Sequence, residues 1–95
     1  MAKGYWIAHV DVTDADNYPL YVAASSKVIQ KFGGRPIVRG GRFEAMEGSS
    51  RTRNVVVEFE SYEKALAAYQ SADYQEALKL RQQYGVSDFI VVEGA

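Results

Sequence analysis

Two strand-like segments carry apolar residues at both alternate positions, and this pattern constrains the fold more than any other feature of the chain. One segment contains Ile7-Ala8 and the other contains Val55-Val56-Val57. Because successive side chains of a strand point to opposite faces of its sheet, a sheet centred on these segments must be buried on both faces. The chain has 95 residues, enough for one domain over residues 1–95 but for little covering material.

The remaining periodicities place helical and strand-like segments around these two. The predicted strands span residues 5–12, 36–46, 52–59 and 89–93. Predicted helical regions span residues 18–32 and 61–84. Gly33-Gly34 ends the first helix, and the second region, with start signals at Ser61 and Ser71, is either one kinked helix or two short ones. At Gly40-Gly41 we expect a bulge or a close backbone approach.

The resulting order, strand-helix-strand-strand-helix-strand, predicts an α+β fold of the ferredoxin-like type with a four-stranded antiparallel sheet. Crossover connections of one handedness place both helical regions on the same side of that sheet. The other side is then an apolar patch of Tyr5, Ile7, Val56 and alternate residues of 89–92, larger than soluble monomers usually expose. A symmetric second copy is the simplest cover, so we predict a homodimer.

Composition excludes several classes of function. The 11 Lys and Arg residues nearly balance the 12 Asp and Glu residues, giving a net charge of -1, so no nucleic-acid partner is expected. With no cysteine and one histidine, neither a disulfide nor a thiol nucleophile is available, and no metal site or other cofactor is expected. Met1-Ala2-Lys3-Gly4 leads directly into a strand-like segment, so we expect no signal peptide, no membrane span and a cytoplasmic protein.

The chain resembles the domain-of-unknown-function 1330 family, within the dimeric α/β-barrel superfamily, from about Gly4 to Gly94. The resemblance is carried by a set of short segments: Gly4-Tyr5-Trp6-Ile7-Ala8, Tyr18, Tyr21, Gly33-Gly34, Val38-Arg39-Gly40-Gly41-Arg42-Phe43-Glu44, Glu47-Gly48, Val55-Val56-Val57-Glu58-Phe59, Ser61-Tyr62-Glu63-Lys64-Ala65, Ser71-Ala72-Asp73-Tyr74 and Ser87-Asp88-Phe89. It implies a ferredoxin-like protomer whose sheet packs against that of a second protomer, forming a barrel with helices outside. It implies no established reaction, since similar members of the superfamily include cofactor-free monooxygenases, isomerases, haem-binding proteins and stress-related proteins.

His9 is the first candidate for a catalytic acid or base. It lies in the first strand with Asp11 on the same side. If the third strand lies beside the first, Glu58 shares this face, and a carboxylate near an imidazole raises the imidazole pKa towards the working range. The alternative is a histidine that is merely satisfied within the dimer interface.

Arg39 and the neighbouring Gly40 and Gly41 form a candidate substrate-binding segment. The guanidinium suits an anionic group, and the glycines allow a close backbone approach. Five arginines surround this hairpin, and in the alternative interpretation they pair with the acidic residues there. These arginines are Arg35, Arg39, Arg42, Arg51 and Arg53; the acidic residues are Glu44, Glu47 and Glu58.

Six tyrosines fall on the predicted helices, where they form either plain core or the wall of a pocket. Tyr69 and Tyr74, near the helical break, are the two we select as substrate-binding candidates. Asp88, just before the last predicted strand, is interpreted as a cap or an ion-pair partner for an arginine. The sequence thus favours a small pocket that binds an aromatic or carboxylate-bearing metabolite and transforms it through His9, Arg39 and Glu58. A non-catalytic dimeric module for regulation, stress response or assembly is the competing hypothesis, and it requires a closed core around His9.

Overall fold

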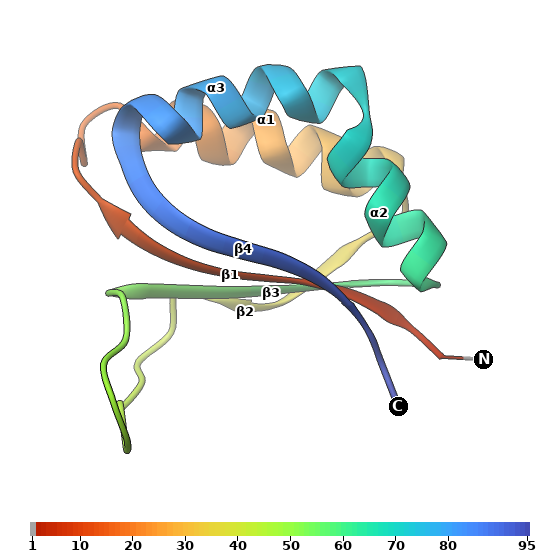
Figure 1. Ribbon diagram of the computed structural model, residues 1–95. Helices are drawn as coiled ribbons and strands as arrows, with labels where there is room; N and C mark the ends of the chain where they lie inside the picture. The colour runs from red at the N-terminus through yellow and green to blue at the C-terminus, as the bar shows by residue number, and fades with distance from the viewer. Residues whose placement is uncertain (1) are drawn as a thin grey trace.

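The computed structural model describes residues 2–95 and contains four strands and three helices within that range (Figure 1). In chain order they are β1 (Gly4–Val12), α1 (Tyr18–Lys31), β2 (Arg35–Arg39), β3 (Arg53–Phe59), α2 (Tyr62–Gln70), α3 (Ala72–Tyr84) and β4 (Gly85–Glu93). The strands form one antiparallel sheet in the order β2-β3-β1-β4. This arrangement confirms the predicted ferredoxin-like α+β fold, with β1 and β3 in the centre.

All three helices cover the same face of the sheet, which we call the inner face, and the opposite outer face carries no helix (Figure 1). Trp6, Val57 and Phe59 point to the inner face and are buried. The Trp6 indole donates a 2.8 Å hydrogen bond from Nε1 to the backbone oxygen of Ala65. Ala65 is fully buried, so its small side chain allows α2 to lie close to the sheet.

The helical region of residues 61–84 is two helices. Ser71 has an extended backbone, with φ -64° and ψ 151°, which interrupts the helical path. Its side chain accepts a 3.2 Å hydrogen bond from the Tyr74 backbone N–H, and Ser61 caps α2 in the same way through the Lys64 N–H. Each serine therefore satisfies one of the free N–H groups at a helix start.

The structure corrects two predicted strand boundaries. The strand predicted over residues 36–46 ends at Arg39, since β3 begins only at Arg53 and the loop of residues 40–52 has no partner strand. The expected bulge lies earlier, between Pro36 and Val38. The last strand begins at Gly85, directly after α3, instead of at residue 89.

The outer face is apolar along its middle. Tyr5, Ile7 and Val56 are half-buried there. Several large apolar side chains are more than one-third exposed on the same face: Val38, Val86, Ile90 and Val92. This surface matches the uncovered patch that the alternation of apolar residues predicts. No helix within residues 2–95 combines the length and apolar character needed to cross a membrane.

Candidate functional site

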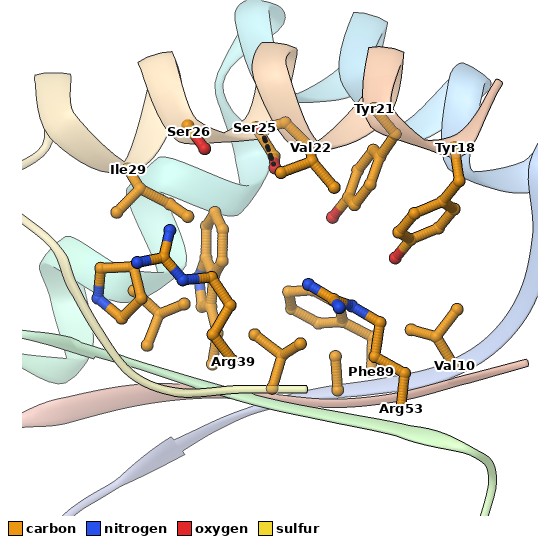
Figure 2. Close-up of a pocket in the computed structure, with 15 residues that line it drawn as sticks. Val10, Tyr18, Tyr21, Val22, Ser25, Ser26, Ile29, Arg39, Arg53 and Phe89 are labelled. Carbon is orange, nitrogen blue, oxygen red and sulfur yellow. Dashed lines mark hydrogen bonds between the residues drawn. The ribbon is translucent and has the colours of Figure 1, made fainter. Parts of the chain in front are cut away.

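A cavity lies between α1 and the inner face of the sheet, and we call it the inner cavity (Figure 2). Tyr18, Tyr21, Val22, Ser25 and Ile29 follow one another at helical spacing along the sheet-facing side of α1 and form its roof. Its floor consists of inner-face residues from all four strands: Trp6, Ala8, Val10, Pro36, Arg39, Arg53, Val55, Val57 and Phe89. The cavity is therefore mostly apolar, with two arginines in its wall.

Small side chains at the centre explain why this space stays open. Ala8 occupies the middle of β1 and Ser25 the middle of α1, so neither side chain reaches across the layer between helix and sheet. The Ser25 hydroxyl donates to the Val22 backbone oxygen at 3.2 Å and is thus satisfied within its own helix. The free space is about 50 Å³, several times the roughly 10–15 Å³ that one water molecule needs.

Arg53 is the more buried of the two arginines that line the inner cavity. It is half-buried, and its guanidinium carbon lies 5.8 Å from the centre of the Tyr18 ring. Its Nε atom is buried without a hydrogen-bond partner within residues 2–95. No carboxylate of the described residues forms an ion pair with Arg53. Buried charges are normally paired, so this arginine has spare capacity for an anion.

Arg39 stands at the mouth of the inner cavity. It is exposed and, like Arg53, forms no ion pair within the described part of the chain. A second hollow of about 310 Å³, the vestibule, shares Ser26, Ile29, Pro36 and Arg39 with the inner cavity and opens to solvent. Figure 2 shows Arg39 and Arg53 extending from the sheet towards α1. Arg39 therefore lines both hollows, whereas Arg53 lines the inner cavity alone.

Gly40 makes the predicted close backbone approach. A Cβ atom at this position would lie 2.5 Å from Nη1 of Arg53, and Gly40 has a φ of +67°. Its N–H donates a 2.9 Å hydrogen bond to the Asn54 backbone oxygen. Gly40 therefore leaves room for the Arg53 guanidinium, whereas nothing lies within 4 Å of a Cβ atom at Gly41.

Two hydroxyl groups face these arginines from α1. Burial raises the pKa of Tyr18, the Tyr21 hydroxyl raises it further, and the positive charge of Arg53 opposes both effects. The Tyr21 hydroxyl lies 2.8 Å from that of Tyr74 in a buried contact. Tyr74 in turn accepts a 2.8 Å hydrogen bond from Nη1 of Arg81, so a chain of polar groups connects the cavity to α3.

The structure separates the predicted catalytic residues His9 and Glu58 from the predicted substrate-binding residue Arg39. His9 and Glu58 lie on the outer face, whereas Arg39 lies on the inner face. Moreover, His9 pairs across the sheet with Asn54, and Glu58 pairs with Tyr5 four positions away, which corresponds to about 13 Å along a strand. Glu58 and His9 are therefore not in contact within the protomer, and the prediction that they are was wrong. Glu58 instead binds Arg35 at 3.2 Å.

His9 lines a separate, open and polar hollow of about 460 Å³ on the outer face. Its Nδ1 atom contacts the side-chain oxygen of Asn54. In the same hollow, Arg51 binds Asp11 at 2.9 Å and Asp88 at 3.0 Å. The ion pair expected between Asp88 and an arginine is therefore confirmed. Hydrogen bonds from Thr52, with Arg51 assisting, lower the pKa of Asp11. These contacts fasten the end of the loop of residues 40–52 to β1 and β4.

Of the two tyrosines selected as ligand contacts, neither lines the inner cavity. Tyr74 is fully buried, and Tyr69 packs on its ring with 5.1 Å between the ring centres. Sequence reasoning missed Tyr18 and Tyr21 as cavity residues, although both belong to the predicted apolar stripe of α1. Arg53 was named only as part of the arginine cluster, and its alternation with Val55 and Val57 was the available signal that it points inward.

Comparisons with known proteins identify the family. The chain matches the family described as Domain of unknown function (DUF1330) over residues 3–95. The chain belongs to the DUF1330 family. No curated protein matches this DUF1330 chain.

Solved structures similar to the DUF1330 protein share its fold. A protein of unknown function from Rhodopseudomonas palustris has a TM-score of 0.76 at 19% identity, covering 99% of this chain and 83% of that one. A dimeric ferredoxin-like protein of unknown function from Thermobifida fusca has a TM-score of 0.63 at 17% identity, with 99% and 91% covered. SnoaB, a cofactor-independent oxygenase from Streptomyces nogalater, has a TM-score of 0.63 at 7% identity, with 97% and 92% covered.

Proposed function

We propose that this DUF1330 protein is a homodimer that binds a small carboxylate-bearing molecule in the inner cavity. The observation that carries the proposal is the half-buried Arg53 guanidinium, which lines an apolar cavity and has no acidic partner within residues 2–95. A carboxylate matches the planar donors of a guanidinium and supplies the missing countercharge. Arg39 at the mouth attracts the same charge as it enters.

The apolar floor defines the rest of the ligand. The aromatic rings of Trp6 and Phe89 lie 5.3 Å apart between their centres, and with Val55 they offer hydrocarbon surface to a ring or a short aliphatic chain. Pockets for small molecules commonly combine such a lining with a few convergent polar groups and have about 300–1,000 Å³ of space. The inner cavity alone offers about 50 Å³ and the adjoining vestibule about 310 Å³, so a ligand of that size extends from the inner cavity into the vestibule. This arrangement favours a metabolite with one charged end and one apolar end.

The homodimer part of the proposal rests on the outer face. Ile90 is 55% exposed on a surface that the helices leave uncovered. Covering such a surface with an identical copy removes apolar area from water, which stabilises the dimer by roughly 25 cal/mol per Å² buried. The structural neighbour from Thermobifida fusca is described as dimeric, which supports a homodimer here.

Chemical turnover is not part of this proposal. His9 and Glu58 lie on the opposite face of the sheet from the inner cavity, so they are not placed to act on a ligand held by Arg53 of the same protomer. The Streptomyces neighbour is an oxygenase, but folds of this kind support many unrelated activities.

A titration with benzoate and its neutral analogue benzamide tests the proposed binding. We expect the amide signals of β3 and α1 residues in two-dimensional NMR spectra to shift with benzoate. Arg53→Gln should weaken benzoate binding by roughly 10- to 100-fold, since a hydrogen bond to a charged group contributes roughly 1.5–3 kcal/mol and about 1.4 kcal/mol corresponds to a factor of ten. Benzamide should bind wild type and Arg53→Gln alike.

Arg42→Gln is the matched control, because it removes the same charge from an exposed residue outside the inner cavity. It should leave benzoate affinity within about twofold of wild type, as exposed and unpaired charges contribute little. Benzoate that fails to bind wild type, or that binds Arg53→Gln as tightly, contradicts the proposal.

A further inference from the structure

Arg81 fixes the direction of a hydrogen-bond chain that ends at the inner cavity. Its side chain is buried at 6% exposure, and Nη1 donates a 2.8 Å hydrogen bond to the Tyr74 hydroxyl oxygen. Its guanidinium carbon lies 4.9 Å from the ring centre of Phe89 and 5.9 Å from that of Tyr21. A guanidinium has donors and no acceptor. The Tyr74 oxygen must therefore accept in this bond.

The second bond of the chain takes its direction from the first. Tyr74 is fully buried, and its hydroxyl has two partners among residues 2–95, Arg81 and Tyr21. Burial raises the pKa of Tyr74, so its hydroxyl keeps its proton at neutral pH. The Tyr21 oxygen, at 2.8 Å, is the acceptor available to that proton. If Tyr21 donated instead, the Tyr74 proton would be buried without a partner, at a considerable cost in stability.

We infer that Tyr21 is a fixed hydrogen-bond donor whose hydroxyl proton points into the inner cavity and selects a ligand with an acceptor oxygen at that place. Its oxygen, 2.8 Å from that of Tyr74, accepts the Tyr74 proton by the argument above, and no acceptor within residues 2–95 takes the Tyr21 proton. Tyr21 lines the inner cavity, and Figure 2 shows its hydroxyl projecting from α1 towards the sheet. Donation from Arg81 through Tyr74 polarises the chain and makes Tyr21 a better donor.

This inference rests on the proposed function and narrows its ligand class. Arg53 on the floor and Tyr21 on the roof are both donors towards the space between them. A group with acceptor oxygens only, such as an ionised carboxylate, satisfies both residues at once. A ligand whose polar end carries only N–H donors meets a donor at Tyr21 and a positively charged donor at Arg53, so the cavity should bind amines and amidines of the same shape more weakly than carboxylates.

Neutron diffraction from crystals of the deuterated protein tests the direction without any ligand. We expect the deuterium between the two hydroxyl groups to be bonded to Tyr74, and the Tyr21 deuterium to lie on the cavity side. A Tyr21 deuterium that points at the Tyr74 oxygen overturns the inference, whatever the protein binds.

Benzoate titration of Tyr21→Phe tests the consequence for binding. Loss of a donor to a charged ligand should weaken benzoate binding about tenfold, with the fold confirmed by an unchanged NMR spectrum outside the cavity. Tyr62→Phe removes a half-buried hydroxyl that lies outside the cavity and forms no hydrogen bond within residues 2–95, and should bind as wild type does. If benzoate binding depends on Arg53 but is equal in Tyr21→Phe and wild type, this inference fails while the proposed function stands. If benzoate binding is also independent of Arg53, both fail.

Discussion

Arg81 donates a 2.8 Å hydrogen bond to Tyr74 in the interior of the protein, where no carboxylate of residues 2–95 pairs with its charge. Nε of the same guanidinium is buried without a partner. Because the hydroxyl of Tyr74 satisfies a buried charged donor, Tyr74→Phe should lower the free energy of unfolding by about 1–3 kcal/mol. Urea denaturation followed by circular dichroism measures this change.

Tyr62→Phe is the control for that measurement, since it removes a hydroxyl with no hydrogen bond within residues 2–95, and its effect should be within about 0.5 kcal/mol. Equal stability of Tyr74→Phe and wild type would show that water reaches the Arg81 guanidinium and replaces the tyrosine.

Because the outer face is uncovered, we predict that the protein self-associates through it. A single charged side chain introduced on this face should prevent that association. Ile90→Glu places a carboxylate on this face and should convert the dimer to a monomer at micromolar concentration, because burying an unpaired charge is costly. Sedimentation velocity measures the outcome. Leu20→Glu is the matched control, since Leu20 is 54% exposed on α1 and Ile90 is 55% exposed on β4; it should remain dimeric. Monomeric wild type at this concentration contradicts the prediction.

The elements of the fold were predictable because local chemistry defines them. Ser61 and Ser71 cap helices where the sequence indicates starts, and Gly33, with a φ of +72°, ends α1. The length of β2 was not predictable, since Val38 and Phe43 suit a strand on either side of Gly40. A strand needs a partner as well as suitable residues, and β3 offers none beyond Arg39.

The sequence indicated which types of residue belong to the candidate site, but it did not show which of these residues lie close together. Alternation correctly placed His9 and Glu58 on one face, but their separation depends on the pairing register, which no single strand reveals. The irregularity between Pro36 and Val38 shifts the alternation by one residue, and this moves Arg39 to the inner face. A bulge placed after Arg39, as the sequence suggested at Gly40, would have left it on the other side.

The pKa of Asp11 predicts how acid affects the loop of residues 40–52. The backbone N–H of Thr52 is the largest cause that lowers this pKa below its ordinary value of 3.8, and Arg51 contributes further. A lowered pKa means that the anchoring is present above the unfolded value and is lost as the pH falls through the folded one. The Thr52 amide shift in NMR spectra should therefore titrate with a midpoint below 3.8.

Substitution of Arg51 separates the contribution of the Thr52 N–H to the lowered pKa of Asp11 from that of the Arg51 guanidinium. Arg51→Gln should raise the midpoint only in part, because the Thr52 N–H, which donates to Asp11 at 3.0 Å, remains. Asp11→Asn should abolish the transition at Thr52. A midpoint that returns fully to the ordinary value in Arg51→Gln would assign the effect to the ion pair instead.

Carboxylate binding should depend on the absence of a side chain at Gly40. Gly40→Ala places a Cβ atom 2.5 Å from Nη1 of Arg53, so the guanidinium must move and benzoate affinity should fall several-fold. The φ of +67° adds a backbone cost of about 1–2 kcal/mol for a residue with a side chain. Gly41→Ala is the control, because its Cβ atom meets nothing within 4 Å, and both affinity and stability should stay near wild type. If Gly40→Ala is less stable but binds benzoate as well as Gly41→Ala does, the position of Arg53 does not depend on Gly40.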